Sequence, residues 1–238
     1  MYRPLQLFIG LRYTRAKRRN HFISFISLTS MLGIALGVTA LITVLSVRNG
    51  FENELRQRIL GMTSHATISG YGEVLTNWDS LAQLADKHPR VVGSAPYIQK
   101  EGMLIHGQQV NGSIIRGVLP AEEPKVSDVT DNMASGKLEE LQAGEFRIIL
   151  GIDLARILGV MVGDKVTLVT PSANVTPAGV MPRLKRFTVS GIFEVGMYEY
   201  DSALALIHLD DARRLFRMGD GVTGLRLKLD DLFRAPFV

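Results

Sequence analysis

Five histidines and one glycine–lysine pair are the residues of this sequence that first suggest chemistry. The histidines lack the short spacing that brings ligands to one metal ion, so we expect surface or strand residues at His21, His65, His88, His106 and His208. Gly136-Lys137 superficially resembles a phosphate-binding P-loop. However, Asp131 stands where that motif begins with glycine, and Leu138 replaces its Ser or Thr. The sequence therefore predicts no ATP site of this type.

Other catalytic signatures are absent from the sequence. It contains no G-x-S-x-G or H-E-x-x-H motif, and no close pair of carboxylates in a setting typical of acid/base catalysis. With no cysteine, thiol catalysis and thiolate metal sites are excluded. We therefore predict a non-catalytic protein with no catalytic residues, no metal site and no cofactor, whose work is binding, sensing or force transmission.

The segment 171–186 (PSANVTPAGVMPRLKR) is the strongest candidate for binding. It contains three prolines and no acidic residue, so we expect a stiff, projecting loop that loses little entropy when it docks. Apolar Val175, Ala178, Val180 and Met181 lie near its centre, followed by basic Arg183, Lys185 and Arg186. This pattern suits a partner with a hydrophobic surface and an acidic rim. A solvated hairpin loop without a partner remains the alternative.

One long apolar segment anchors the chain. Phe22 to Val47 contains no charged residue and as a helix reaches roughly 39 Å, more than the hydrocarbon thickness of a bilayer. A buried helix of a soluble protein and a cleaved signal peptide are the alternatives. Because the apolar run continues beyond Ala40, it is too long for a signal sequence. We therefore predict a transmembrane helix that is retained.

Charge sets the orientation of this helix. Six cations and no acid precede it: Arg3, Arg12, Arg15, Lys17, Arg18 and Arg19. The positive-inside rule places them in the cytoplasm, with the remaining domain on the opposite side of the membrane. They also account for the net charge of +4, so that charge is no sign of nucleic-acid binding.

Three features flank or mark the helix. Residues 2–11 fit a short interfacial helix, although a disordered leader fits nearly as well. Small residues at helical spacing form a face that another helix could approach closely, although small residues are common in membrane helices: Ser30, Gly33, Gly37 and Ala40. Phe51, Leu55 and Ile59 extend the helix as an amphipathic stalk.

The rest of the sequence predicts an α+β domain. Strands are expected at 65–69, 103–106, 110–118, 147–150, 165–170, 187–193, 203–209 and 222–229. Helices are expected at 78–87, burying Leu81 and Leu84, at 153–158, and from the N-cap Asp210 to Phe216. Residues 120–124 are expected to form an exposed connector.

Three blocks of sequence resemble the permeases of lipoprotein-releasing ABC transporters, the LolC/LolE type. They are the basic leader with the apolar span and its NGFENEL stalk, the block RIILGIDLARILGVMVGDKVTLVTPSANVTPAGVMPRLKRFTVSGIF, and DSALALIHLDDARRLFR. In this family the loop with T-P-A-G-V-x-P is a hook that engages a soluble periplasmic carrier. The resemblance therefore implies a carrier-binding role for Val175, Thr176, Pro177, Ala178, Gly179, Val180, Met181 and Pro182, with Arg183, Lys185 and Arg186 as supporting basic residues.

The resemblance also implies an architecture and a set of partners. It implies a cytoplasmic leader (1–21), a transmembrane helix (22–47) in the inner membrane and a periplasmic core (48–238) of two subdomains, with an insertion at about 112–200. The partners would be a cytoplasmic ATPase subunit, a second permease subunit, a periplasmic carrier, lipoprotein substrates and membrane lipid. A mechanotransmission or efflux permease of the related MacB/FtsX-like type is the alternative.

One departure from the family is large. The family has three further membrane helices and a cytoplasmic coupling helix after the periplasmic domain, whereas this sequence ends at FRAPFV. Without a coupling helix the polypeptide could not receive the stroke of the ATPase. We therefore expect a fragment or frameshifted form that is not a working permease by itself.

Overall fold

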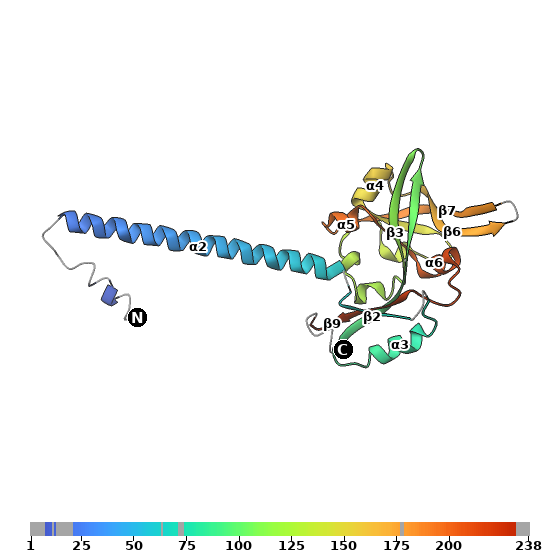
Figure 1. Cartoon of the computed structure of the whole chain (residues 1–238), viewed down its shortest axis with the longest axis horizontal. Coiled ribbons are helices and arrows are strands. Elements are labelled where there is room, and N and C mark those ends of the chain that lie inside the picture. Colours follow the sequence, from blue (N-terminus) through green and yellow to red (C-terminus); the bar gives the residue numbers. More distant parts are fainter. Residues whose placement is uncertain are drawn as a thin grey trace. The chain divides into compact units, whose positions relative to one another are not determined.

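The computed structural model describes residues 8–10, 12, 21–62, 64–70, 74–176 and 179–231 (Figure 1). Two compact units make up the chain, Met1–Glu54 and Leu55–Val238. Phe8–Gly10 is helical, whereas residues 2–7 and 11 of the predicted interfacial helix lie outside the described residues, so that helix stays a prediction.

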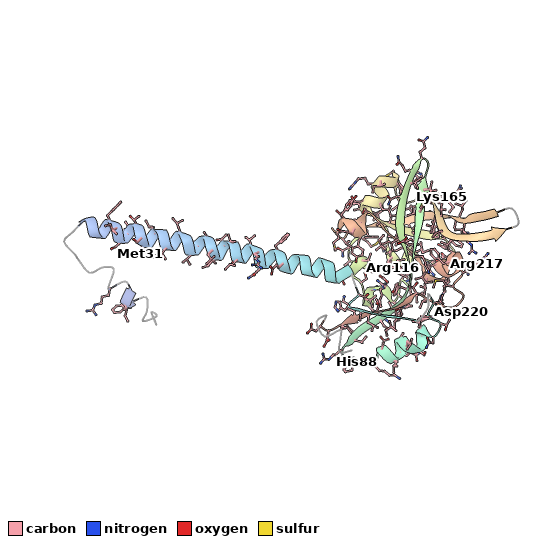
Figure 2. The ribbon with its side chains drawn as sticks, viewed as in Figure 1. Met31, His88, Arg116, Lys165, Arg217 and Asp220 are labelled. Carbon is pink, nitrogen blue, oxygen red and sulfur yellow. The ribbon has the colours of Figure 1, made fainter. Side chains whose placement is uncertain are left out.

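Helix α2, His21–Met62, makes up most of the described part of the first unit, and its last residues belong to the second. Its segment Phe25–Glu52 is long and apolar enough to cross a membrane, with a mean hydropathy of 2.1 and no part buried. Side chains along it, Met31 among them, point outward from the helix (Figure 2). The hydroxyls of Thr29, Thr39 and Thr43 donate to backbone carbonyls four residues earlier, at 2.8–2.9 Å. These bonds satisfy the three threonine hydroxyls without water, as a bilayer favours.

The helix continues without a break through the predicted stalk to Met62. Its small-residue face, Ser30, Gly33, Gly37 and Ala40, is exposed. No atom of the described chain comes within 4 Å of a Cβ built at Gly33 or Gly37, apart from the helix's own backbone. A partner helix on this face therefore stays a prediction.

The second unit confirms the α+β class. Its strands are β1 (Ala66–Ser69), β2 (Val91–His106), β3 (Gln109–Val118), β4 (Met133–Ser135), β5 (Arg147–Gly151), β6 (Lys165–Thr176), β7 (Gly179–Phe193), β8 (Leu204–His208) and β9 (Gly224–Leu229). They follow the order β1-β9-β2-β3-β8-β5-β7-β4, with β6 beside β2 and β7. The pairs β3–β8 and β5–β7 are parallel, and the other pairs are antiparallel.

In the described part of this unit, four further helices and three 3₁₀ turns accompany the strands. They are α3 (Trp78–Ala85), α4 (Ile152–Leu158), α5 (Tyr198–Asp201) and α6 (Leu209–Phe216), with the turns at Glu123–Lys125, Asp128–Thr130 and Leu138–Glu140. The largest core cluster joins α4 and α6 to the sheet through side chains such as Leu154, Leu215 and Phe187. Gly159 ends α4 in the left-handed conformation, as expected of a helix-terminating glycine.

Strand β2 is much longer than its sequence predicts. It begins at Val91, whereas the predicted strand began at residue 103. The prediction was too short because Gly93, Pro96 and Gly102 interrupt the apolar pattern that marks a strand. Its first half pairs with β9 and its second half with β3 and β6. Gly93 is needed there, since a Cβ would lie 2.8 Å from the Cβ of Lys125.

The division of this unit into two subdomains, with the insertion at about 112–200, stays a prediction.

Two local predictions about helices are wrong. Leu84 is 65% exposed because it lies on the outer side of α3, whereas Leu81 packs against the core. The N-cap of α6 is His208, whose Nδ1 accepts from the backbone N–H of Asp210 at 3.2 Å. Asp210 instead lies in the first turn of the helix, where a carboxylate is favoured by the helix dipole.

The predicted exposed connector at 120–124 is wrong at Glu123, whose side chain is 1% exposed and forms an ion pair with Arg226 of β9. Arg116, labelled in Figure 2, interacts electrostatically with both Glu123 and Arg226. Burial first, and then the charge of Arg226, lower the pKa of Arg116 to about 10. Its guanidinium donates to the Gln99 side chain at 3.0 Å. Glu123 therefore supplies the buried counter-charge of Arg226, and its charge also favours the protonated form of the nearby Arg116.

Gly136, half of the apparent P-loop pair, has a structural role. Its φ is +72°, and a Cβ there would lie 2.1 Å from the carbonyl oxygen of Ser190. Glycine is thus required by the backbone conformation and by close contact with β7. These constraints explain why glycine occupies position 136, so phosphate binding is not needed to explain it.

Candidate functional site: the β6–β7 arm

The binding segment predicted as a loop is a β-hairpin. β6 and β7 pair from Lys165–Thr188 to Thr176–Gly179, and they project from the rest of this unit (Figure 1). β6 pairs with β2 at Thr167–Val169. Beyond that point the two strands pair only with each other within the described chain. We call residues 170–183 the arm.

The three prolines led to the prediction of a loop, because proline lacks the N–H group that pairs neighbouring strands. The register shifts between Thr170 and Ala173, so that Pro171 lies in an irregularity of β6, while Pro182 pairs with Ala173. In a two-stranded ribbon both strands are edges, where proline and bulges are tolerated. The arm therefore keeps its pairing despite its composition.

The predicted hook residues lie at the end of this arm. Val175 and Thr176 end β6, Gly179, Val180, Met181 and Pro182 begin β7, and Pro177 and Ala178 lie outside the described residues. Val175 is opposite Val180, and Thr176 is opposite Gly179. The backbone thus brings the predicted residues of β6 and β7 together, and their role in binding stays a prediction.

The three supporting basic residues divide into two kinds. Arg183 donates from Nη1 to the backbone carbonyl of Leu215 at 3.1 Å, and Lys185 places Nζ 3.4 Å from the centre of the Phe146 ring. Both side chains are half-buried on the side of β7 that continues into the core. Arg186 is exposed on the other side. Arg183 and Lys185 therefore fix the base of the arm, and a supporting role of the three residues in binding stays a prediction.

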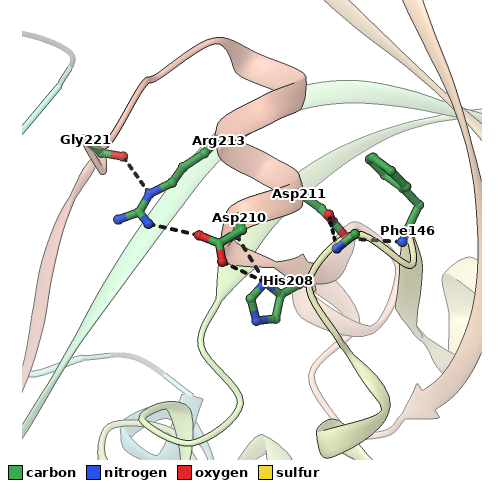
Figure 3. A network of polar contacts seen from close by, with 7 residues as sticks. Phe146, His208, Asp210, Asp211, Arg213 and Gly221 are labelled. Atoms are coloured by element: carbon green, nitrogen blue, oxygen red, sulfur yellow. Dashed lines mark hydrogen bonds and ion pairs between the residues drawn. The ribbon is translucent and has the colours of Figure 1, made fainter.

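Phe146 is held in place by a buried carboxylate (Figure 3). Asp211, on α6, is completely buried and accepts from the backbone N–H groups of Gly144 at 2.8 Å and Phe146 at 3.1 Å. Phe146 has a φ of +52°, an unfavourable value for a large side chain. Its ring packs edge-on against Phe187 of β7, with centroids 5.7 Å apart. The chain Asp211–Phe146–Lys185 therefore ties α6 to the base of the arm.

The opposite side of α6 carries a more exposed set of contacts (Figure 3). Arg213 donates from Nη1 to Asp210 at 3.0 Å and from Nε to the carbonyl of Gly221 at 3.3 Å. Its guanidinium also lies 5.5 Å from the Trp78 ring. These contacts fix the loop after α6, and they make Trp78, the one tryptophan of the chain, a reporter of this region.

Lys185 offers a direct test of the contact with Phe146. We expect Lys185→Met to lower the free energy of unfolding by about 0.5–1 kcal/mol, the usual worth of a partly exposed cation–π contact. Urea unfolding of the chain in lipid nanodiscs, followed by Trp78 fluorescence, measures it. Lys165→Met, at an exposed position of the same hairpin, is the control and should change stability by less than about 0.5 kcal/mol. Equal effects of the two changes would contradict the assigned role.

Sequence reasoning missed Phe146 and Asp211. Neither belongs to a motif, and Asp211 meets its two donors across 65 and 67 positions of sequence. Helical periodicity places Asp211 on α6 but does not reveal its partners. In the described ranges, no three His, Asp or Glu side chains are grouped closely enough to hold a metal ion.

Comparison with known proteins places the chain in a family. The profile of the MacB-like periplasmic core domain matches residues 27–234. The lipoprotein-releasing system transmembrane protein LolC of Neisseria meningitidis is 50% identical over 98% of the chain, and that of Xylella fastidiosa is 50% identical over 99%. LolE of Haemophilus influenzae is 32% identical over 96%.

These relatives confirm the resemblance drawn from the sequence motifs. The chain spans 56% of the length of each of the three relatives. The matched region includes most of α2 and the described part of the arm. The chain therefore belongs to the family of the MacB-like periplasmic core domain, and it is similar to the LolC and LolE transmembrane proteins within that region.

Proposed function

We propose that this chain supplies the first membrane helix and the periplasmic core of a permease subunit in an ABC transporter that releases lipoproteins. The observation that carries the proposal is the projecting arm of a chain 50% identical to LolC over almost its whole length. A two-stranded ribbon that leaves the sheet can reach a partner while its base stays anchored in the core. The arm is thus the element that recruits a soluble lipoprotein carrier.

Charge and hydropathy support the orientation in this proposal. The leader carries six cations and no acid, and Phe25–Glu52 follows as an apolar span. The positive-inside rule then places the leader in the cytoplasm and the domain with the arm in the periplasm. This is the side of the inner membrane on which a soluble carrier can receive a lipoprotein.

The remaining partners follow from the proposed role. The chain has no recognisable P-loop, so a separate cytoplasmic subunit would hydrolyse ATP, and the chain itself would be non-catalytic. A second permease subunit would pack against the small-residue face Ser30, Gly33, Gly37 and Ala40 of α2. Lipoprotein substrates and membrane lipid would enter between the two subunits.

The register of the hairpin defines a clean test of the arm. Ala173 and Pro182 lie opposite each other, so an Asn-Gly turn can replace residues 174–181 and close the shortened hairpin. We expect this variant in nanodiscs to lose binding of the purified periplasmic carrier by at least about 100-fold, since it removes the centre of the contact. Biolayer interferometry provides the measurement.

Its control lies on the neighbouring hairpin. Gln108→Ala changes an exposed residue at the β2–β3 turn and should leave carrier binding unchanged. Unaltered Trp78 fluorescence and urea midpoint would show that the shortened arm leaves the core folded. If the shortened variant still bound the carrier, the arm would not be the docking element. If the unmodified chain failed to bind, the lipoprotein-release role would be rejected in favour of mechanotransmission.

A further inference from the structure

Arg183 lies where the arm leaves the rest of its unit. The pairing of β6 with β2 ends at Val169, and Arg183 is opposite Thr170, the next residue of β6. Farther out, the two strands pair only with each other within the described chain. The base of the arm is therefore the place where this two-stranded ribbon could bend.

The end of a helix holds Arg183 at this place. Its Nη1 donates to the carbonyl oxygen of Leu215 at 3.1 Å, and Leu215 is a buried residue in the last turn of α6, which lies beside the base of the arm (Figure 1). The last four carbonyls of a helix have no partner within it and carry its negative partial charge, so a guanidinium is favoured there. Since α6 packs into the largest core cluster, this bond ties the arm to a fixed element.

The neighbours of Arg183 show to which side it points. Arg183 and Lys185 are half-buried, whereas Leu184 and Arg186 are exposed. Successive side chains of a strand point to opposite faces, so Arg183 lies on the face that meets the core. It is thus placed to hold the arm rather than to contact a carrier.

A small rotation at the base is a large movement at the end of the arm. A strand of about six residues extends about 20 Å, so a rotation of about 10° at Arg183 moves the far end by about 3.5 Å, close to one residue along a strand. An arm that samples several directions binds only through the fraction that points correctly, and its association slows by that fraction. Once a carrier is bound, it holds the arm itself, so dissociation is unaffected.

We propose that Arg183 is a positioning residue, whose bond to the end of α6 holds the arm in the direction that receives the carrier. This inference rests on the proposed function of the arm and names the residue that prepares the arm for binding. Arg183 thereby sets the rate of capture without touching the carrier.

Distances between the arm and the core test this orientation without a carrier. The chain has no cysteine, so spin labels can be attached at Asn174→Cys on the arm and at Lys137→Cys, an exposed position of the same unit. Double electron–electron resonance on the whole chain in nanodiscs should give one narrow distribution of distances. We expect Arg183→Met to broaden it, and Arg183→Lys, which keeps a donor for the Leu215 carbonyl, to keep it narrow.

The rates of binding and release of the purified periplasmic carrier, measured by biolayer interferometry, test the consequence. Arg183→Met should slow association by about three- to tenfold and change dissociation by less than about twofold. Lys165→Met removes the same charge from an exposed position of the same hairpin and should leave both rates and the distances unchanged. If Arg183→Met alters the Trp78 fluorescence of the core, Arg183→Thr, a good strand former that is too short to reach α6, provides the same test.

A distance distribution that stays narrow in Arg183→Met would overturn the inference, whether or not the carrier binds. Faster dissociation with unchanged association would also overturn it, because Arg183 would then contact the carrier directly. A broadened distribution with unchanged rates would show that the direction of the arm does not control capture, and would overturn it as well. Failure of the unmodified chain to bind the carrier would reject the proposed function, and the distances would still decide whether Arg183 holds the arm.

Discussion

Glu123→Gln should lower the free energy of unfolding by about 3–5 kcal/mol, the usual cost of removing one partner of a buried ion pair. The side chain of Arg226 is 4% exposed, and its Nε and Nη1 groups have no other acceptor within the described residues. Its guanidinium also lies 5.7 Å from the Tyr97 ring. Glutamine keeps the size of the side chain but leaves two neighbouring arginines without their buried counter-charge. Urea unfolding in nanodiscs, followed by Trp78 fluorescence, measures the loss.

The adjacent Glu122 is a matched control for this experiment. It pairs with Lys125 at the surface, where the two side chains are 36% and 51% exposed. Glu122→Gln should therefore change stability by less than about 1 kcal/mol. A second variant, Glu123→Leu combined with Arg226→Met, should be more stable than either single change, since it removes both buried charges. A loss below about 1 kcal/mol in Glu123→Gln would refute the assigned importance of the pair.

The same cluster determines how Arg116 responds to pH. Its pKa in the folded chain, about 10, is below the ordinary value for arginine because burial and Arg226 disfavour its charge. The folded chain therefore releases this proton at lower pH than the unfolded chain does. Its unfavourable contribution is constant at neutral pH and is relieved only as the pH rises through about 10. Changes in stability near pH 7 would therefore come from other groups.

Asp211→Ala should destabilise the second unit by about 2–4 kcal/mol, because two backbone N–H groups would lose their buried acceptor. The carboxylate receives the N–H groups of Gly144 and Phe146, and Phe146 in turn supports Lys185 at the base of the arm. The Trp78 unfolding curve measures the loss of stability. Carrier binding should also weaken in this variant, because the base of the arm loses its support.

Asp210→Ala is the neighbouring control. The Asp210 side chain is 41% exposed, and its ion pair with Arg213 lies near the surface. We therefore expect a loss of no more than about 1 kcal/mol. Asp211→Asn, which retains one acceptor oxygen, should fall between the two variants. Similar losses in Asp210→Ala and Asp211→Ala would contradict the assignment of Asp211 as the support of Phe146.

Patterns between near neighbours in sequence made the elements predictable. The uncharged run from Phe22 to Val47 predicts α2, and its residues are exposed along the whole described part of the span. A short apolar run predicts β5, alternation predicts the start of β6, and Gly159 marks the end of α4. Prediction failed where residues that usually interrupt strands lie inside one. The prolines of the arm and Gly93 and Pro96 of β2 are such residues.

The sequence by itself determined the membrane helix, the charge of its leader, the α+β class and the segment that forms the arm. Each of these depends on composition or on periodicity within about 20 residues. Only the tertiary structure decided that Glu123 meets Arg226 and that Asp211 supports Phe146. The physical reason is strand order: a mixed sheet brings together residues far apart in sequence, and no local pattern specifies which of them become neighbours.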